Sequence, residues 1–399
     1  MNKKTIKDLG DIRGKRIFVR ADLNVPQDEK GKITDDIRIR ESLATLKFLL
    51  GGGARVILAS HLGRPKGKEA VWSLAPVAQR LRELLPKTKI IMANDCIGAE
   101  VLRQATALKD GEILLLENVR FYKEEVDNDR EHAKKLAALA EIFVNDSFGV
   151  NHRAQSSITG IAEFLPAVAG FLVEKEISIL GNAIANPKRP LTVILGGKKI
   201  ADKIPVIDNL LNLANTIIIG GGMTYTFIKA QGGKIGNSVV DDSKLEYCAE
   251  VLKTAKKKGV RILLASDTVA ADKFANDAKT QTVDTFKIPD GWEGLDIGPE
   301  TVESIKTIMR GSGTIIWNGP LGVFELDKFI AGTREVAKAI GEATKAGAIT
   351  IVGGGDSAAA VAQLGLADKF THISTGGGAS LEMMEGKILP GVAALEDKK

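Results

Sequence analysis

The chain has 399 residues, more than one hydrophobic core usually serves, since single cores stop growing at roughly 250–300 residues. We therefore expect two domains. Its hydrophobic fraction of 44% and charged fraction of 26% are typical of a water-soluble globular protein. Lysine and arginine exceed the acidic residues by only five, and aromatic residues make up only 5%. With no basic stripe interleaved with aromatics, the composition argues against a nucleic-acid-binding platform.

Two cysteines, Cys96 and Cys248, lie far apart in the sequence. This spacing indicates neither a disulfide framework nor a metal cluster, so we interpret both as buried thiols in a reducing compartment. The first ten residues include lysines but no apolar core follows them, and no apolar run approaches the roughly 20 residues of a membrane helix. These features predict a cytoplasmic protein.

In the first half of the chain, short β-branched runs alternate with longer helical patterns, which is typical of βα units and a parallel sheet. We expect strands at 17–19, 56–59, 90–92, 113–116 and 142–144. A helix is expected at 36–50, where Gly51 is placed to end it. A second helix should open at Ser73, with Pro76 tolerated in its first turn.

Beyond Pro166 the pattern changes. Residues 171–185 are predicted to form one helix between Pro166 and Pro187, and we place the domain boundary on it, with its ends as hinges. Strands then resume at 192–195, 216–219, 261–264, 314–317, 348–352 and 372–374. The sequence thus predicts an α/β protein of two doubly wound parallel-sheet (Rossmann-like) domains joined by a helix hinge. The expected extents are 1–170 for the first domain, 171–186 for the hinge helix, 187–385 for the second domain and 386–399 for a C-terminal tail.

Ligands of open parallel sheets bind beyond the carboxyl ends of the strands. In the first half, the residues after each predicted strand are rich in cations. They are Arg20 with Arg38 in the following helix, Arg64 after the second strand, Arg120 after the fourth, and Arg153 after the fifth. A single arginine there is ordinarily a solvated loop residue. Several on one sheet edge predict a basic surface that binds phosphate or carboxylate through bidentate guanidinium contacts.

In the second half, the strands run into glycines instead. The glycine runs are Gly196-Gly197, Gly220–Gly222, Gly353–Gly355 and Gly376–Gly378. Any one of them could be an ordinary tight turn. Glycine also lets a ligand approach the backbone amides, and the N-terminus of a following helix binds anions. Together the loops predict a site for a nucleotide with a polyphosphate tail.

Two further features accompany the glycine loops. Lys199 and Lys203 lie four residues apart and are expected on one face of the helix after Gly197, where a bound phosphate would offset their conflict with the helix dipole. Asp356 precedes an alanine-rich helix. It could be that helix's N-cap or an oxygen ligand for the Mg²⁺ that accompanies a nucleotide.

Several common motifs are absent from the sequence. There is no G-x-x-x-x-G-K-[ST], which argues against a P-loop enzyme, and no G-x-G-x-x-G follows the first strand, which disfavours a dehydrogenase. The four histidines, His61, His132, His152 and His372, show no metal-ligand spacing.

Eight stretches carry a family likeness: RADLNVP, HLGRP, LENVRF, NDSFGVNHR, GGKKIADKI, WNGPLGVFE, GGGDSAA and STGGGASLE. In this order they resemble the motifs of the phosphoglycerate kinase family, and they span Arg20 to Glu382. HLGRP and GGGDS together with GVFE are specific, whereas each alone would be weak. One departure is Lys198, which stands where family members commonly have a small residue.

The resemblance implies reversible phosphoryl transfer between 1,3-bisphosphoglycerate and ADP, giving 3-phosphoglycerate and ATP, in glycolysis and gluconeogenesis. It implies a monomer that uses Mg²⁺, with the 386–399 tail packed on the first domain. The implied substrate-binding residues are Asp22, Leu23, Asn24, Arg38, His61, Leu62, Gly63, Arg64, Arg120 and Arg153. The implied catalytic groups are Arg38, Lys199 and the amides of Gly376 and Gly377. The implied nucleotide-binding residues are Lys203, Gly294, Glu325, Gly354, Gly355, Asp356 and Ser357, with Asp356 on Mg²⁺.

Other functions are considered beside this one. Another carboxylate kinase, acting on acetate or aspartate, would not need Arg64, Arg120 and Arg153. A non-catalytic nucleotide-binding regulator on the same scaffold could lose Arg38 or Lys199, and both are present. A carboxylate acceptor has a reference pKa near 4 and is already ionised at pH 7. For 3-phosphoglycerate we therefore expect no general base.

Overall fold

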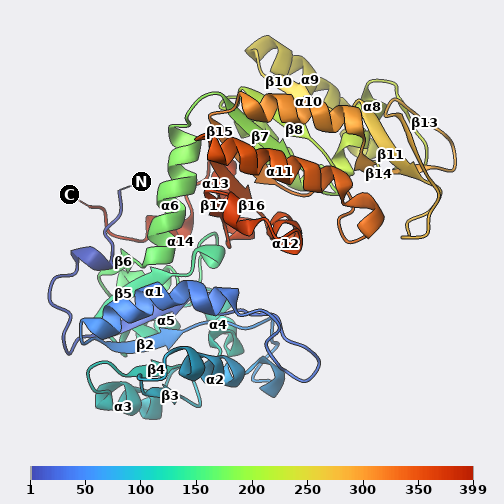
Figure 1. Cartoon of the computed structure of the whole chain (residues 1–399). Helices are drawn as coiled ribbons and strands as arrows, with labels where there is room; N and C mark the ends of the chain where they lie inside the picture. Colours follow the sequence, from blue (N-terminus) through green and yellow to red (C-terminus); the bar gives the residue numbers. More distant parts are fainter. Residues whose placement is uncertain (1, 399) are drawn as a thin grey trace. The chain divides into compact units, whose positions relative to one another are not determined.

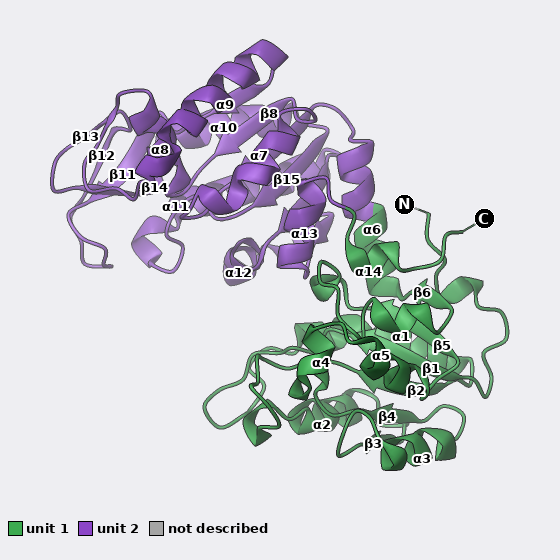
Figure 2. Cartoon of the chain, turned by 180° about the vertical axis from the view of Figure 1, so that it is seen from behind, with its two compact units in different colours: residues 1–178, 388–399 green, residues 179–387 purple. Residues whose placement is uncertain are grey.

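The computed structural model describes residues 2–398, which form two compact units (Figure 2). Unit 1 runs to Ser178 and takes in the chain again from Ile388 onward, and unit 2 is Ile179–Lys387. The chain passes from unit 1 to unit 2 within helix α6 (Phe171–Ala185), whose bounds are those predicted from the sequence. It returns to unit 1 after Lys387.

Unit 1 is built on a six-stranded parallel sheet with the strand order β3-β4-β2-β1-β5-β6 (Figure 1). Its strands are β1 (Arg16–Ala21), β2 (Arg55–Ala59), β3 (Ile90–Met92), β4 (Ile113–Leu115), β5 (Ile142–Asp146) and β6 (Ala167–Ala169). Its helices are α1 (Ile37–Gly51), α2 (Ala75–Leu84), α3 (Ala99–Ala107), α4 (Lys123–Val126), α5 (Arg130–Ala137) and α14 (Pro390–Ala393).

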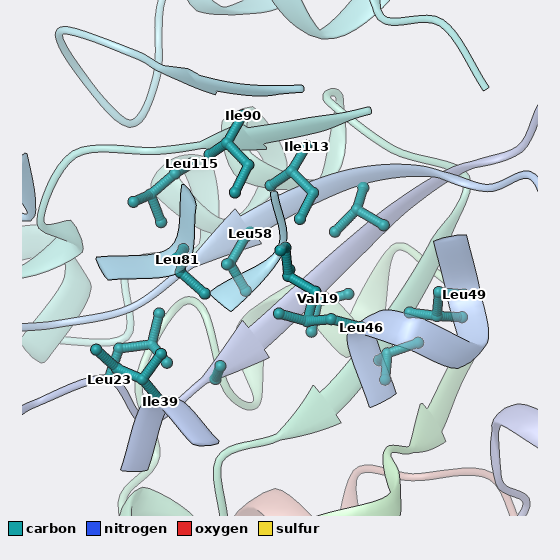
Figure 3. Close-up of a cluster of buried hydrophobic side chains, with 14 of the residues drawn as sticks. Val19, Leu23, Ile39, Leu46, Leu49, Leu58, Leu81, Ile90, Ile113 and Leu115 are labelled. Atoms are coloured by element: carbon teal, nitrogen blue, oxygen red, sulfur yellow. The ribbon is translucent and has the colours of Figure 1, made fainter. Parts of the chain in front are cut away.

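The central strands of this sheet are buried along nearly their whole length, as expected for parallel strands covered on both faces. Val19 of β1 and Leu58 of β2 belong to a core cluster that also holds Leu46 of α1 and Leu81 of α2 (Figure 3). The apolar faces of these helices therefore cover one side of the sheet and fix its position.

Unit 2 is built on a second six-stranded parallel sheet, with the order β10-β8-β7-β15-β16-β17. Its strands are β7 (Leu191–Leu195), β8 (Thr216–Ile219), β10 (Arg261–Leu263), β15 (Thr314–Asn318), β16 (Ile349–Gly353) and β17 (His372–Ile373). Its helices are α7 (Ile204–Leu210), α8 (Met223–Ala230), α9 (Leu245–Lys258), α10 (Pro299–Arg310), α11 (Ala331–Lys345), α12 (Gly355–Gln363) and α13 (Gly377–Met384). Helices α10 and α11 pack against each other along the unit (Figure 1).

Unit 2 also contains strands that the sequence did not predict. A three-stranded antiparallel sheet has the order β12-β11-β14, and two short strands form the pair β13-β9. Their bounds are β9 (Lys234–Ile235), β11 (Asp267–Ala271), β12 (Thr280–Asp284), β13 (Lys287–Ile288) and β14 (Glu293–Ile297). Polar residues or glycine interrupt the apolar residues of β11, β12 and β14, and β9 and β13 are only two residues long, so none has the β-branched run on which the prediction relied.

The predicted α/β architecture with two parallel sheets is confirmed, and its topology locates the sites. In unit 2 the first strand, β7, lies between β8 and β15, and this is where the direction of winding reverses. In unit 1 the corresponding position is β1, between β2 and β5. Ligands of such sheets bind at the carboxyl ends of the strands beside this reversal.

The C-terminal segment is fixed to unit 1 by backbone and side-chain contacts. Lys4 N donates to the carbonyl of Glu396 at 2.8 Å, and Gly391 N donates to the carbonyl of Asn151 at 2.9 Å. Leu389 is fully buried, whereas its neighbour Ile388 is 70% exposed.

Two simpler predictions concern composition. Cys96 and Cys248 are both buried free cysteines, as predicted. A search of residues 2–398 for a helix with the length and apolar character needed to cross a membrane finds none.

The C-terminal segment yields a prediction about stability. Leu389→Ala should lower the free energy of unfolding of unit 1 by about 2–5 kcal/mol, because it removes a fully buried side chain and leaves a cavity. Ile388→Ala is the matched control and should change it by no more than about 0.5 kcal/mol, because that side chain is exposed. Urea unfolding with hydrogen exchange of the β1 amides measures both, and equal effects of the two variants would refute the packing described here.

Candidate active site

The loops after β1 and β2 are tied to each other at the carboxyl edge of the unit 1 sheet. The carboxylate of Asp22 accepts a hydrogen bond from Arg38 Nη1, which comes from the first turn of α1. Asn24 Oδ1 accepts from Gly63 N at 2.8 Å. Strand-end residues predicted from three separate segments therefore lie together.

Around His61 the structure concentrates positive charge. His61 is only 2% exposed. The pKa of His61 is held well below its ordinary value, first by burial and then by the guanidinium groups of Arg20, Arg120, Arg38 and Arg153. Four arginines, from β1, from α1 and from the segments after β4 and β5, thus act on one imidazole, as expected for a preformed anion site.

Arg120 has the least satisfied guanidinium in this cluster. The residue is 9% exposed, and its Nη1 donates to the carbonyl of Gly63 at 2.9 Å. Within residues 2–398 its Nε and Nη2 have no hydrogen-bond partner. Burial, with Arg20 and Arg153 nearby, lowers the pKa of Arg120 to about 10. A buried cation with unused donors is costly, and a bound anion would remove that cost.

The remaining residues predicted for unit 1 differ in their placement. Leu23 and Leu62 pack in the hydrophobic core, so only their backbone groups could contact a ligand. Arg153 is half-buried, and its Nε lies 3.2 Å from His152 Nε2. Arg64 is exposed.

The glycine-rich strand ends of unit 2 enclose a cavity of about 570 Å³. Seven of the predicted residues line it, namely Lys199, Lys203, Gly354, Gly355, Asp356, Ser357 and Gly377. Gly376 is the N-cap of α13, immediately before this lining. The carboxyl ends of β7, β15 and β16 therefore meet at one cavity.

The close approach of two backbones explains the glycines at the floor of this cavity. A Cβ atom at Gly196 would lie 2.1 Å from the carbonyl oxygen of Pro320. A Cβ atom at Gly319, whose φ is +97°, would lie 2.2 Å from the carbonyl oxygen of Gly196. The loops after β7 and β15 therefore touch without side chains between them, and the amides of Gly196, Gly197 and Gly319 donate within the protein, to Asn318, Pro320 and Ser357.

The prediction that Lys199 and Lys203 share one helix face is wrong. A 3₁₀ turn occupies Ala201–Lys203, and α7 begins only at Ile204. Lys199 precedes both in an irregular segment. The helix starts late because Gly197 turns the chain at φ +113°, and Pro205 fits the first turn of α7, where no N–H is needed. Both lysines nevertheless line the cavity.

Lys203 is held within the cavity wall. Its Nζ donates to Asn318 Oδ1 at 2.5 Å. Burial lowers the pKa of Lys203, and Asp202 and Asp356 oppose that shift. An ammonium group in this position is partly desolvated, which strengthens its interaction with a phosphate.

For Asp356 the N-cap role left open by the sequence is wrong. Gly354, at φ +92°, is the N-cap of α12, and no side chain caps the helix. Asp356 lies in the first turn, exposed and in the cavity lining. Ser357, by contrast, is buried, and its Oγ accepts from Gly319 N at 2.5 Å, which ties α12 to the end of β15.

Two residues predicted to bind nucleotide, Gly294 and Glu325, are not among those that line the cavity. Gly294 lies in β14, where its N donates to Ser238 Oγ at 2.9 Å. A Cβ atom there would lie 2.0 Å from the hydroxyl of Tyr225, so packing alone requires glycine. Glu325 is exposed.

The sequence reasoning missed some residues that the structure brings to the sites. Asn318 and Gly319 line the cavity at the end of β15. The strand-end rule could have found them, because a strand was predicted directly before them. Ser157 and Glu125 support Arg20 from outside any predicted strand end. No sequence signal marked them.

Comparison with known proteins agrees with the resemblance of the motifs. The sequence model of the family "Phosphoglycerate kinase" matches residues 6–387. The chain is 56% identical over 398 residues to the cytosolic phosphoglycerate kinase of Triticum aestivum, covering 99% of each. It is 56% identical over 401 residues to the chloroplastic enzyme of Volvox carteri, covering 99% of this chain and 87% of that protein. The solved structure of phosphoglycerate kinase from Coxiella burnetii superposes with a TM-score of 0.90 at 40% identity, covering 98% of each chain. The chain therefore belongs to the phosphoglycerate kinase family.

Proposed function

We propose that this chain catalyses reversible transfer of a phosphoryl group between 1,3-bisphosphoglycerate and ADP, giving 3-phosphoglycerate and ATP. The observation that carries the substrate assignment is Arg120, a buried guanidinium with unused donors among arginines that have converged at one sheet edge. A substrate with a phosphate at one end and a carboxylate at the other supplies the anions that such a cluster requires.

On the substrate side, Arg120, Arg153 and Arg64 bind the phosphate of 3-phosphoglycerate. Asn24 and Asp22 fix the position of the loop that holds the rest of the molecule. The exposed Arg64 closes over the phosphate from solvent, whereas Arg120 is in place before binding.

The acceptor atom is a carboxylate oxygen, which is ionised at neutral pH. The reaction therefore needs no general base, and the protein contributes positioning and charge stabilisation. Arg38 turns from Asp22 toward the migrating phosphoryl group and stabilises its equatorial oxygens, and Lys199 does the same from the nucleotide side.

On the nucleotide side, Lys203 binds the phosphates together with the amides of Gly354 and Gly355 and with Ser357. Of the two proposed catalytic amides, Gly376 N already donates to Ser374 Oγ at 3.2 Å. Gly377 opens α13, where the N–H groups of the first turn have no intrahelical partner. We therefore assign the greater part of the transition-state contact to Gly377.

Asp356 fits a role as Mg²⁺ ligand. Among residues 2–398 no group of three or more His, Cys, Asp or Glu side chains could hold a metal. Mg²⁺ with a nucleotide commonly takes one or two carboxylates and leaves its other positions to water and phosphates. An exposed carboxylate in the cavity lining meets that need. The ion, when bound, would supply positive charge that offsets the phosphates.

Transfer requires both substrates within reach of one phosphoryl group, although their sites are built in different units. We propose hinge bending at the ends of α6 and at the return of the chain after Lys387, which would also exclude water from the acyl phosphate. Each site draws its residues from a single chain, so the enzyme acts as a monomer. The name of the wheat relative supports action in the cytoplasm.

A coupled assay with ATP and 3-phosphoglycerate tests the function. Arg38→Ala is the variant that tests the proposed mechanism most sharply. The wild type should form 1,3-bisphosphoglycerate, whereas Arg38→Ala should lose at least about 100-fold in kcat, because an aligned cation at the developing charge is missing. ADP affinity should stay within twofold. Arg40→Ala, two residues along α1 and exposed, is the control and should keep normal turnover. No product from the wild type would refute the proposal, and near-normal turnover of Arg38→Ala would refute the role of Arg38.

The cavity of unit 2 yields a separate prediction. Lys203→Met keeps most of the side-chain volume but removes the charge, so the affinity for Mg-ADP measured by calorimetry should fall roughly tenfold or more. Affinity for 3-phosphoglycerate should not change. Lys253→Ala, an exposed lysine of α9, is the control. An unchanged ADP affinity in Lys203→Met would show that the nucleotide phosphates lie elsewhere.

A further inference from the structure

Arg20 is a fully buried guanidinium that takes no part in the substrate binding proposed above. It lies on β1, in register with Ala59 of β2, two residues before His61. Its Nε donates to Ser157 Oγ at 2.8 Å, its Nη1 donates to the carbonyl of Ala21, and its Nη2 lies 3.2 Å from His61 Nδ1. Arg20 is therefore bonded to protein groups, and one of these is a proposed substrate-binding residue.

The chemistry of arginine fixes the direction of every bond in this chain of contacts. A guanidinium stays protonated and only donates. Ser157 Oγ accepts from Arg20 and donates a hydrogen bond to Glu125 Oε1 at 2.6 Å, while Glu125 Oε2 accepts from Ser157 N at 2.9 Å. His61 Nδ1 must likewise accept from Arg20 Nη2. If Nδ1 carried a proton, two donors would face each other across 3.2 Å.

The charges around this chain agree with that assignment. Glu125 is fully buried, and it opposes the lowering of the pKa of Arg20 that burial causes. Burial raises the pKa of Glu125, and Arg20 opposes that shift in turn. The two groups therefore support each other's charged forms. A second positive charge on His61 would have no such partner, because the guanidinium groups that face it are all cationic.

We propose that Arg20 is a positioning residue, held in place by Ser157 and Glu125, that keeps His61 neutral with its proton on Nε2. His61 then presents a single N–H donor to an oxygen of the anionic substrate, a step that rests on the function proposed above. The neighbouring arginines supply positive charge to the site, whereas the N–H group of His61 fixes where a substrate oxygen can bind. That oxygen must lie in line with the Nε2–H bond.

Nitrogen NMR of histidine-labelled protein tests the tautomer without any substrate. The chain has four histidines, so His61 can be assigned by the signal lost in His61→Gln. The wild type should show His61 protonated only on Nε2 between about pH 6 and 8, because burial and the facing guanidinium groups lower the pKa of His61. A proton on Nδ1 of His61 in the wild type would overturn the proposal.

Variants of the supporting residues test the role of Arg20. The double variant Arg20→Met/Glu125→Gln removes both buried charges together, so neither is left uncompensated. It should allow His61 to take up the Nδ1-protonated or the charged form. Arg20→Lys, with a single donor nitrogen, gives the same readout if the double variant does not fold.

The matched control is Ser156→Ala, a neighbouring fully buried serine whose hydroxyl donates to the carbonyls of Glu124 and Asp129. It should leave the His61 signals unchanged. A folded Arg20 variant with the wild-type tautomer would overturn the role of Arg20.

Kinetics of two His61 variants test the donor itself. The amide nitrogen of glutamine lies near the position of Nε2, and that of asparagine near Nδ1. His61→Gln should keep KM for 3-phosphoglycerate within a few fold, whereas His61→Asn should raise it roughly tenfold or more, the cost of one hydrogen bond to a charged group. KM for ATP should stay within twofold in both. The opposite order would overturn the proposal. A wild type without turnover would refute the proposed function, and the NMR measurement would still decide the role of Arg20.

Discussion

The structure of unit 1 depends on how it holds several guanidinium groups together in a place with little water. Like charges repel, and burial removes the solvent that would screen them. Arg20 is stabilised by Glu125 through Ser157, and Arg38 by Asp22. Arg120 has no such carboxylate bond, and two of its nitrogens lack partners within residues 2–398. Because carboxylate partners are unequally distributed among these arginines, Arg120 is the one that a bound anion at the carboxyl edge of the sheet would stabilise most.

The cavity of unit 2 is built in a different way. Its strand ends approach so closely that side chains are excluded, as Gly196 and Gly319 illustrate. Glycines and the first turns of α12 and α13 line the cavity, together with the charged side chains of Lys198, Lys199, Asp202, Lys203 and Asp356. Of the three lysines, Lys203 is half-buried and bonded to Asn318. The two units thus share a sheet topology but differ in what they place at its edge.

Sequence reasoning reached the architecture with its two parallel sheets, because strand periodicity is a local property. The strand-end rule also indicated residues that line the cavity of unit 2, and their binding roles stay predictions. Sequence reasoning failed where three-dimensional context decides. Lys199 and Lys203 do not share a helix face, because α7 begins only at Ile204, directly before Pro205. The N-cap of α12 is Gly354 and not Asp356. Ser157 and Glu125 come from segments with no strand pattern, so their support of Arg20 became visible only in the fold. In the antiparallel strands of unit 2, polar residues or glycine interrupt the β-branched pattern, so no strand signal is present in the sequence there.

The central claim is that each unit carries one half of the reaction: unit 1 binds the acidic substrate through charge, and unit 2 binds the nucleotide through backbone. Hydrogen exchange of the whole chain, with each ligand added alone, tests this most directly. We expect 3-phosphoglycerate to slow exchange at strand-end amides of unit 1, such as Gly63, and Mg-ADP to slow it at Gly355 and Gly377. Protection of the unit 2 loops by 3-phosphoglycerate alone, or of the unit 1 loops by Mg-ADP alone, would contradict the account.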